Sequence, residues 1–547
     1  MNVFDAIIEI LKREGVEFLS CYPTTNIIES AAAASLRPII CRQERVGVGI
    51  ADGFSRVSNG RRLGVFAMQF GPGAENAFSG VATAYSDCVP ILLLPWGHDN
   101  YRAGIPPYFS SVTGYAPVTK HVEQINMPGR VADIMRRAFS LLRMGRLGPV
   151  MLEIPRDVSV QTVEQLDYEP VKITRAAADP RDVDEAVRVL LSARHPVIHA
   201  GQGVLYAEAW PELLEFAELV QVPVVTTLLA KSVFPEDHPL SLGVGYRAMT
   251  GTSFHFLKQA DVLFGIGCSF SRHHQSAMIP AGKTIIHATN CAADINREYY
   301  ADHPVIGDAK LVLRQFIEAA RERLGKQGRR GNGEVTAEIR QIKEKWLAEW
   351  MPKLTSDEVP INPYRIVWEL MRTINPAQTI ITHDSGSPRD QLAPFYQATV
   401  PRGYLGWGKS HGLGTGLGLI MGAKLASPEK IAINIMGDAA FGMVGLDFET
   451  AVRNKIPIIT MVFNNFGLAV NTEGMPISHE RYRSRDTIGN YAEMGRAMGG
   501  YAERVESPAE IVPAIQRAVK VTREEERPAL LEFITRQEIS YSLIQAL

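Results

Sequence analysis

Short apolar runs that alternate with longer segments of helical period constrain the fold of this chain more than any other feature. Runs such as "HPVIHAG", "ADVLFGIG" and "IPIITMVF" are rich in valine, isoleucine and leucine, and amphipathic stretches separate them. Parallel strands that are buried on both faces are apolar throughout, and helices make the crossover connections between them. The pattern predicts an α/β fold of mostly parallel sheets covered by helices.

The length of the chain predicts several domains, because 547 residues exceed what one hydrophobic core accommodates. The alternation forms three blocks, at residues 1–165, 181–325 and 361–547, and we expect each block to be a domain. The Gly- and Arg-rich run "GKQGRRGNGEV" (325–335) is typical of a solvated linker, and a charged helix follows it. The first and third blocks show no sequence repeat, but they could still share a topology.

The composition gives no sign of a polyanionic or membrane partner. The formal net charge is -2, so no long-range field favours nucleic acid or a membrane surface. The first 19 residues have the period of an amphipathic helix, and we find no run of about 18 uninterrupted apolar residues, the length that a membrane span needs. Five scattered cysteines without a C-x-x-C pair are typical of a reduced protein, so we expect a cytoplasmic location.

In the third block, a carboxylate and a carboxamide follow two successive apolar runs. Asp438 comes after "KIAINIM", Asn465 comes after "IPIITMVF", and "VGLDFETAVRN" between them is typical of a covering helix. A βαβ crossover makes the two strands parallel, so both side chains should reach the carboxyl edge of the sheet, where α/β folds bind ligands. Such oxygen ligands suit Mg²⁺, which also takes phosphate oxygens and water. Either residue alone is more typical of a turn, but together they favour a metal–diphosphate site.

This segment resembles the diphosphate-binding motif of thiamine diphosphate (ThDP) enzymes. The resemblance implies that Asp438, the Asn465 side chain and the Gly467 carbonyl bind Mg²⁺. Small residues after Asp438 would let backbone N–H groups approach the diphosphate. The family motif usually continues Gly-Asp-Gly, whereas this chain has alanine in the third place. The further cofactor contacts that the resemblance implies here are Gly437, Ala439, Ala440 and Leu468.

The same family places a glutamate at the start of a helix in its other ThDP-binding domain, and "RPIICRQERVGVGIADGF" supplies Glu44 there. In the resembling enzymes this glutamate hydrogen-bonds the aminopyrimidine of the cofactor and activates it, which requires a carboxyl group of raised pKa. A glutamate at a helix start is otherwise typical of a favourable macrodipole interaction. Further segments, such as "MQFGPGAENAFSGVATAYSDCVPILLL", resemble acetolactate synthase-like enzymes, so the likeness covers nearly the whole chain. It implies a pyrimidine domain, a Rossmann-like central domain and a diphosphate domain.

Two more segments are similar to cofactor-binding parts of the family. In "GWGKSHGLGTGLGLIMGAK" the resemblance places Leu413 as the apolar wedge that bends the cofactor and makes the His411 carbonyl an acceptor, with Ser410 beside it. The segment Asp384, Ser385 and Gly386 falls where the family contacts the diphosphate. Because Glu44 and the diphosphate site lie in different blocks, the resemblance also implies a homodimer or homotetramer with active sites between subunits.

The substrate is less constrained by the sequence. Acetolactate synthases carry Gly-Gly where this chain has Thr24 and Thr25, and a glutamine where it has Tyr108 and Phe109, whereas "PTTNI" resembles a run of oxalyl-CoA decarboxylases and 2-hydroxyacyl-CoA lyases. We therefore expect a ThDP- and Mg²⁺-dependent lyase or carboligase acting next to a carbonyl, with a lean toward a 2-hydroxyacyl-CoA substrate. An acetolactate synthase-like decarboxylase and carboligase of 2-oxo acids is the alternative. A flavin oxidase and a non-catalytic nucleotide-binding scaffold are the remaining rivals.

Several features of the sequence stay open. His98 could shuttle protons in catalysis or be an ordinary loop histidine. The glycines of "HAGQGV" (199–204) are compatible with FAD, with ADP or CoA, or with an empty central domain. The C-terminal stretch "LLEFITRQEISYSLIQAL" could be a lid over an acyl-CoA or a frayed tail. We interpret His273 and His274 as surface residues rather than as metal ligands.

Overall fold

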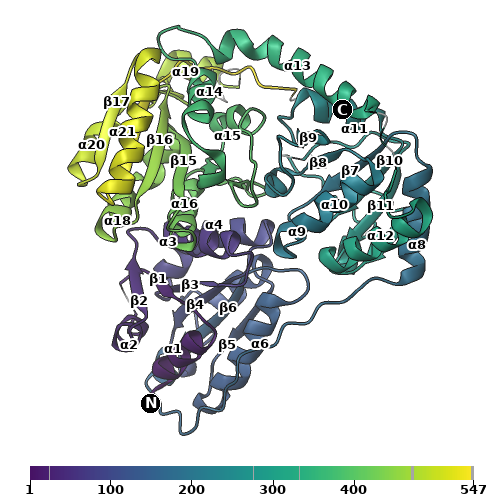
Figure 1. Ribbon diagram of the computed structural model, residues 1–547. Coiled ribbons are helices and arrows are strands. Elements are labelled where there is room, and N and C mark those ends of the chain that lie inside the picture. The colour runs from purple at the N-terminus through teal and green to yellow at the C-terminus, as the bar shows by residue number, and fades with distance from the viewer. Residues whose placement is uncertain (24, 275, 330, 332, 470–473, 544–547) are drawn as a thin grey trace.

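The computed structural model describes residues 1–23, 25–274, 276–329, 331, 333–469 and 474–543. Within these residues the chain forms three α/β units, each built on a six-stranded sheet (Figure 1). Every pairing between named strands of these sheets is parallel. The expected α/β fold with parallel sheets is confirmed.

The first sheet has the strand order β2-β1-β3-β4-β6-β5. Its strands are β1 (Phe18–Cys21), β2 (Arg37–Ile40), β3 (Gly64–Met68), β4 (Ile91–Gly97), β5 (His121–Gln124) and β6 (Val150–Pro155). The α-helices around it are α1 (Val3–Arg13), α2 (Ile27–Ala33), α3 (Glu44–Val57), α4 (Pro72–Ser86), α5 (Ser111–Tyr115), α6 (Val131–Arg143) and α7 (Arg156–Ser159). The expected N-terminal amphipathic helix is α1, which begins with a capping box between Asn2 and Asp5.

The third sheet repeats this topology, with the order β14-β13-β15-β16-β18-β17. Its strands are β13 (Thr379–His383), β14 (Tyr404–Leu405), β15 (Ile431–Gly437), β16 (Ile458–Asn464), β17 (Tyr501–Val505) and β18 (Ala529–Ile534). Its α-helices are α14 (Pro363–Thr373), α15 (Ser387–Leu392), α16 (Thr415–Ala426), α17 (Asp438–Val444), α18 (Phe448–Arg453), α19 (Pro476–Tyr482), α20 (Tyr491–Ala497) and α21 (Ile511–Glu524). The first and third units therefore share one strand order although their sequences show no repeat.

The central sheet has the order β12-β11-β10-β7-β8-β9. Strands β7, β8 and β9 follow one another toward one edge, and β10, β11 and β12 follow one another toward the other, so the strand order switches between β7 and β10. This is the doubly wound arrangement of Rossmann-like domains. Its strands are β7 (Pro196–Ala200), β8 (Val224–Thr226), β9 (Ser241–Val244), β10 (Val262–Ile266), β11 (Thr284–Thr289) and β12 (His303–Ile306). Its α-helices are α8 (Pro180–Ser192), α9 (Gly203–Tyr206), α10 (Trp210–Val220), α11 (Gly251–Gln259) and α12 (Ala309–Leu324), and the long helix α13 (Glu334–Leu354) leads to the third unit.

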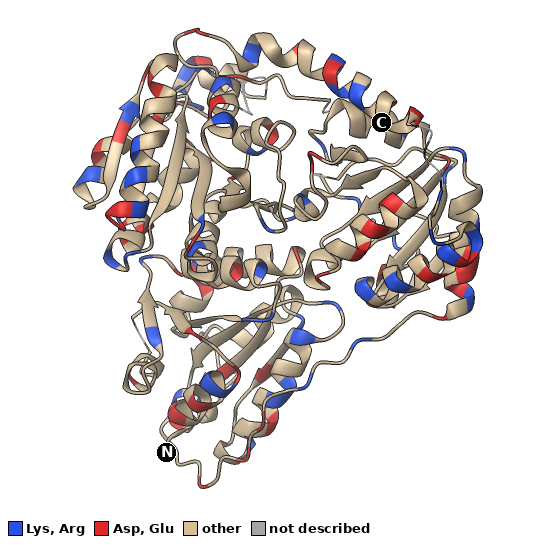
Figure 2. Ribbon diagram, in the orientation of Figure 1, with Lys and Arg blue, Asp and Glu red and all other residues tan. Residues whose placement is uncertain are grey.

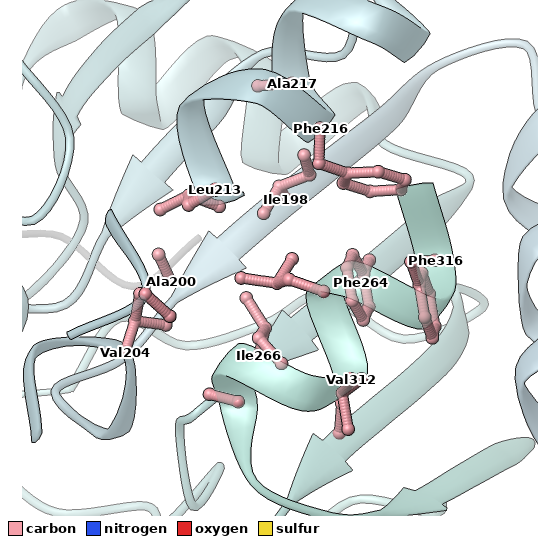
Figure 3. Close-up of a cluster of buried hydrophobic side chains, with 14 of the residues drawn as sticks. Ile198, Ala200, Val204, Leu213, Phe216, Ala217, Phe264, Ile266, Val312 and Phe316 are labelled. Atoms are coloured by element: carbon pink, nitrogen blue, oxygen red, sulfur yellow. The ribbon is translucent and has the colours of Figure 1, made fainter. Parts of the chain in front are cut away.

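Buried apolar side chains hold each unit together. In the central unit, Phe216, Phe264 and Phe316 pack between the sheet and helices α10 and α12 (Figure 3), and the rings of Phe264 and Phe316 stack at a centroid distance of 4.7 Å. Positively and negatively charged residues alternate along the outer helices (Figure 2). No helix among the described residues is long and apolar enough to span a bilayer.

Helix α3 of the first unit packs directly on helix α16 of the third (Figure 1). Glycines make this close approach possible: a Cβ on Gly49 would stand 3.0 Å from the Gly418 Cα atom, and one on Gly418 would stand 2.6 Å from the Val46 carbonyl oxygen. Both helices begin next to predicted site residues, Glu44 for α3 and Leu413 for α16. The helix contact therefore fixes how the two predicted halves of the site are placed within one chain.

Candidate active site

The predicted metal ligands come together at the carboxyl edge of the third sheet. Asp438 follows β15 and Asn465 follows β16, and these strands are parallel neighbours. The backbone N–H of Gly467 donates to both side chains, at 3.1 Å to Asp438 Oδ2 and 3.1 Å to Asn465 Oδ1. The segment between the strands differs from the expected single helix, because α17, a 3-10 turn and α18 share the crossover.

The surroundings of Asp438 suit a cation. Its carboxylate is 2% exposed and also accepts bonds from the Ala439 N–H at 2.8 Å and the Thr487 hydroxyl at 2.6 Å. Burial raises its pKa. Among the described residues no lysine, arginine or histidine forms an ion pair with it. A buried carboxylate of this kind lacks a compensating positive charge, which a divalent ion would supply. Thr487 carried no sequence signal, because it reaches the site from beyond α19.

Small residues leave room beside this carboxylate. A Cβ added at Gly437 would meet only the Pro388 side chain, at 3.9 Å. Ala439 and Ala440 lie in the first turn of α17, where backbone N–H groups have no carbonyl partner within the helix; the Ala439 N–H donates to the Asp438 carboxylate instead. Leu468 is half-buried, and its N–H donates to the Arg485 carbonyl at 2.8 Å. The residues present therefore fit a diphosphate held through a metal ion.

The Asp384 carboxylate holds a turn. Asp384 is fully buried after β13, and its oxygens accept the N–H groups of Gly414 and Gly416, both at 2.9 Å, and of Ser385 at 2.8 Å. Burial raises its pKa to about 6, against these hydrogen bonds. The carboxylate thus fixes the turn that follows Leu413. Ser385 and Gly386, the latter at φ +92°, lead from it into α15.

Leu413 is half-buried and packs against the apolar cluster beneath α16. The backbone of Ser410 is held by α4, since its N–H donates to Ser86 Oγ at 3.1 Å. The exposed ring of His411 stacks on His274 of the central unit, with ring centroids 5.9 Å apart. The three predicted residues therefore share one turn between the first, central and third units.

Glu44 lies at the first position of α3, is 5% exposed, and hydrogen-bonds Asn76 of α4. Burial raises its pKa. The next residue, Arg45, faces the third unit instead: a Cβ on Gly414 would stand 2.9 Å from Arg45 Nη2. Within the described residues, no hydrogen bond joins Glu44 to the third unit. One chain therefore places Arg45, rather than Glu44, against the Leu413 turn.

His98 lies after β4 between two aromatic rings, with centroid distances of 4.7 Å to Phe70 and 4.3 Å to Tyr108. Phe70 lies two residues before the start of α4, the helix that carries Asn76, the partner of Glu44. His98 is thus placed at the same end of the first unit as Glu44. Thr24, on which part of the substrate prediction depended, lies outside the described residues.

A cavity of about 480 Å³ opens where the strand order of the central sheet switches, between the ends of β7 and β10. Ligands of doubly wound sheets bind at this place. The lining includes Gly201 and Gly203 from the central unit, Cys88 from the first and Lys409 from the third. His273 also lines it, which corrects our interpretation of this residue as a surface residue; His274 is exposed, as expected.

The C-terminal segment is anchored up to Ser542. Tyr541 bonds Ser387 at 2.6 Å, and the fully buried Ser542 donates to the Met249 carbonyl at 2.6 Å. Gln537 Nε2 reaches the Asn465 carbonyl at 3.4 Å, so this segment walls the predicted metal site. Over the range 536–542 the segment is therefore neither a frayed tail nor a free lid, the two alternatives that the sequence left open. Residues 544–547 lie outside the described part of the chain.

Comparisons with known proteins agree with this geometry. Three family models match: the N-terminal TPP binding domain of thiamine pyrophosphate enzymes at residues 1–126, their central domain at 183–316, and their C-terminal TPP binding domain at 384–533.

Similar curated proteins are synthases and carboligases. A probable acetolactate synthase large subunit of Methanocaldococcus jannaschii is 31% identical over 95% of this chain and 90% of its own length, and one of Methanococcus aeolicus is 30% identical over 100% and 94%. A glyoxylate carboligase of Escherichia coli O157:H7 is 27% identical over 99% and 94%. These relatives give no support to the lean toward a 2-hydroxyacyl-CoA lyase.

Three matched domains in the family order, together with relatives that align over nearly the whole chain, establish an enzyme that uses thiamine diphosphate to make or break carbon–carbon bonds. The chain belongs to the thiamine pyrophosphate enzyme family, in its acetolactate synthase-like branch.

Proposed function

We propose that this protein is a Mg²⁺-dependent carboligase of 2-oxo acids, with pyruvate as the first substrate to test. The observation that carries the proposal is the buried Asp438 carboxylate, which has no cationic partner among the described residues and shares the Gly467 N–H with the Asn465 side-chain oxygen. The names of similar proteins, acetolactate synthase and glyoxylate carboligase, support a 2-oxo acid over a thioester. The three domains that we propose for this function span residues 1–165, 181–325 and 361–547.

Each part of the site has a separate task in this proposal. Asp438, Asn465 and the Gly467 carbonyl would hold Mg²⁺ and, through it, the diphosphate, and Ser385, Gly386 and the backbone of Ala439 and Ala440 would contact the diphosphate. Bound thiamine diphosphate supplies a nucleophilic thiazolium carbon and an electron sink. Leu413 would offer an apolar surface to that ring. Glu44 holds a proton at its carboxyl oxygen, and burial favours this protonated form by raising the pKa of the carboxyl group.

We further propose that Glu44 serves the site of a second copy of the chain. The support is the direction of α3: Arg45 meets the Gly414 turn of the same chain, and Glu44 faces Asn76 of α4. Exposed apolar residues around the metal site, among them Met443, Leu446 and Ile488, are available to a partner surface. A homodimer is the smallest assembly in which every site is complete.

A cationic group beside His411 fits the carboxylate of a 2-oxo acid. Arg247 bonds His274 at 2.5 Å, and His274 stacks on His411, which adjoins the Leu413 turn. The Arg247 guanidinium can pair with a planar carboxylate through two N–H groups. For the cavity at the switch point of the central sheet we propose a nucleotide such as FAD, since its glycines let a diphosphate approach the backbone.

Product analysis tests the proposal. The purified protein, with thiamine diphosphate and Mg²⁺, is incubated separately with pyruvate, glyoxylate and a 2-hydroxyacyl-CoA, and the products are identified by mass spectrometry. We expect CO₂ release and a carboligation product from a 2-oxo acid, and loss of both when Glu44→Gln is used. Turnover of the thioester alone would contradict the proposed substrate class.

A further inference from the structure

We infer that Asp87 is a positioning residue for the segment 406–413, which carries His411 and Leu413; this inference rests on the proposed function of that segment. Asp87 ends helix α4 of the first domain and is fully buried. Its two carboxylate oxygens accept the backbone N–H groups of Gly408 and Lys409, both at 3.3 Å. A side chain of one domain thus holds the backbone of another just before the cofactor-binding turn.

Arg56 completes this anchor. Its guanidinium is 1% exposed, pairs with Asp52 at 2.8 Å, and approaches Asp87 Oδ2 at 3.3 Å. Its Nη1 donates to the Gly406 carbonyl at 3.1 Å. The segment is therefore held by a carbonyl and two N–H groups against a buried cluster of one guanidinium and two carboxylates. Charges that are removed from water need fixed partners, so this network leaves the segment little freedom.

The end of α4 adds two neutral contacts. Ser86 Oγ accepts the Ser410 N–H at 3.1 Å, and the Thr83 hydroxyl donates to the Ser410 carbonyl at 3.3 Å. On the far side of Leu413, Asp384 holds Gly414 and Gly416. Residues 411–413 therefore lie between two segments whose backbones are held by hydrogen bonds.

Asp87 is not among the residues proposed to contact the cofactor or the reacting atoms. A displacement of about 1 Å in a group that orients reactants can lower a rate roughly 100-fold. Asp87 also accepts a bond at its carbonyl from Gln202 of the central domain, so all three domains meet at this residue.

Two matched variants of the full-length protein test the inference. Asp87→Asn and Asp52→Asn each remove one carboxylate next to Arg56, but only Asp87 touches the segment. In the protein without cofactor, amide hydrogen exchange of a peptide covering 406–413 should become about 10-fold faster in Asp87→Asn, and should stay near the wild-type rate in Asp52→Asn. With cofactor bound, kcat per site should fall roughly 100-fold in Asp87→Asn while KM changes little.

Ser86→Ala keeps the inference testable if Asp87→Asn does not fold. It removes the acceptor of the Ser410 N–H, together with the bond from Ser86 Oγ to the Thr83 carbonyl within α4, and the same peptide should exchange several-fold faster. If Asp87→Asn folds and its peptide exchanges at the wild-type rate, the inference is overturned. If Asp87→Asn does not fold, a wild-type rate in Ser86→Ala overturns it. Equal acceleration of exchange in Asp87→Asn and Asp52→Asn would also overturn it. The wild-type protein could also prove neither to bind thiamine diphosphate nor to turn over 2-oxo acids. If exchange were then faster in Asp87→Asn and unchanged in Asp52→Asn, the anchor would be upheld and the proposed function overturned.

Discussion

Gly418 of α16 lies so close to α3 that a Cβ added to it would stand 2.6 Å from the carbonyl oxygen of Val46. No side chain fits there unless the helices move apart, so the close packing of the first domain on the third depends on this glycine. Gly418→Ala should destabilise the protein by about 1–3 kcal/mol, the usual cost of overpacking. Thermal unfolding measures this, and Gly129→Ala, where a Cβ would meet nothing within 4 Å, is the control. Equal melting temperatures for the two variants would contradict the close packing.

Mixing two inactive variants tests whether each site draws on two chains. Glu44→Gln and Asp438→Ala should each lose at least about 100-fold in turnover, because they remove the proton-holding group and a metal ligand. After joint denaturation and refolding, hybrids with one wild-type site should restore roughly a quarter of the wild-type activity, as random pairing into symmetric dimers predicts. Mixtures as inactive as the separate variants would show that Glu44 and Asp438 serve the same chain.

Replacing Arg247 should weaken substrate binding more than the chemical step. Arg247→Ala removes the guanidinium beside His274, and loss of a charged hydrogen bond of about 1.5–3 kcal/mol corresponds to a KM for pyruvate roughly 10- to 100-fold higher. The nearby Arg272→Ala is the control, because the Arg272 guanidinium lies 4.4 Å from the Tyr299 ring centroid. Steady-state kinetics with an unchanged KM for Arg247→Ala would remove this residue from the substrate site.

Asp447 should give the protein a measurable pH dependence of stability. It is 1% exposed and bonds the Arg42 N–H at 2.8 Å, and burial raises its pKa to about 6. Because the folded pKa exceeds the unfolded one, its stabilising contribution is present below the ordinary pKa of aspartate and is lost as the pH rises through about 6. The loss is at most about 3 kcal/mol.

Asparagine imitates the protonated form of this residue. Asp447→Asn should therefore gain stability relative to the wild type between pH 4.5 and pH 7.5. Urea unfolding at the two pH values measures the difference. A difference between variant and wild type that is the same at both values would refute the shifted pKa.

Much of this architecture could be predicted from the sequence. Continuous apolar runs indicated buried parallel strands, and the βαβ logic placed Asp438 and Asn465 at one sheet edge, where Gly467 now links them. These predictions depend on local patterns, because the sequence of a single βαβ unit contains them within about 40 residues. The same reasoning also allowed the shared topology of the first and third sheets.

Other features depended on contacts between distant segments. Whether Glu44 or Arg45 faces the third domain is decided by the glycine-mediated packing of α3 on α16, which no pattern near residue 44 records. The anchoring role of Asp384 depends on a turn 30 residues later. His273 lines a cavity because three domains meet there. Side chains that are placed by such tertiary contacts leave no local signal.

Titration calorimetry of thiamine diphosphate tests the central claim most directly. With Mg²⁺ present, the wild-type protein should bind the cofactor, and Asp438→Ala should bind it at least about 100-fold more weakly, since the metal that joins diphosphate and protein loses a charged ligand. Adding EDTA should weaken wild-type binding to a similar degree. Unchanged affinity in Asp438→Ala, or binding that is insensitive to removal of the metal, would contradict a metal–diphosphate site at this edge of the third sheet.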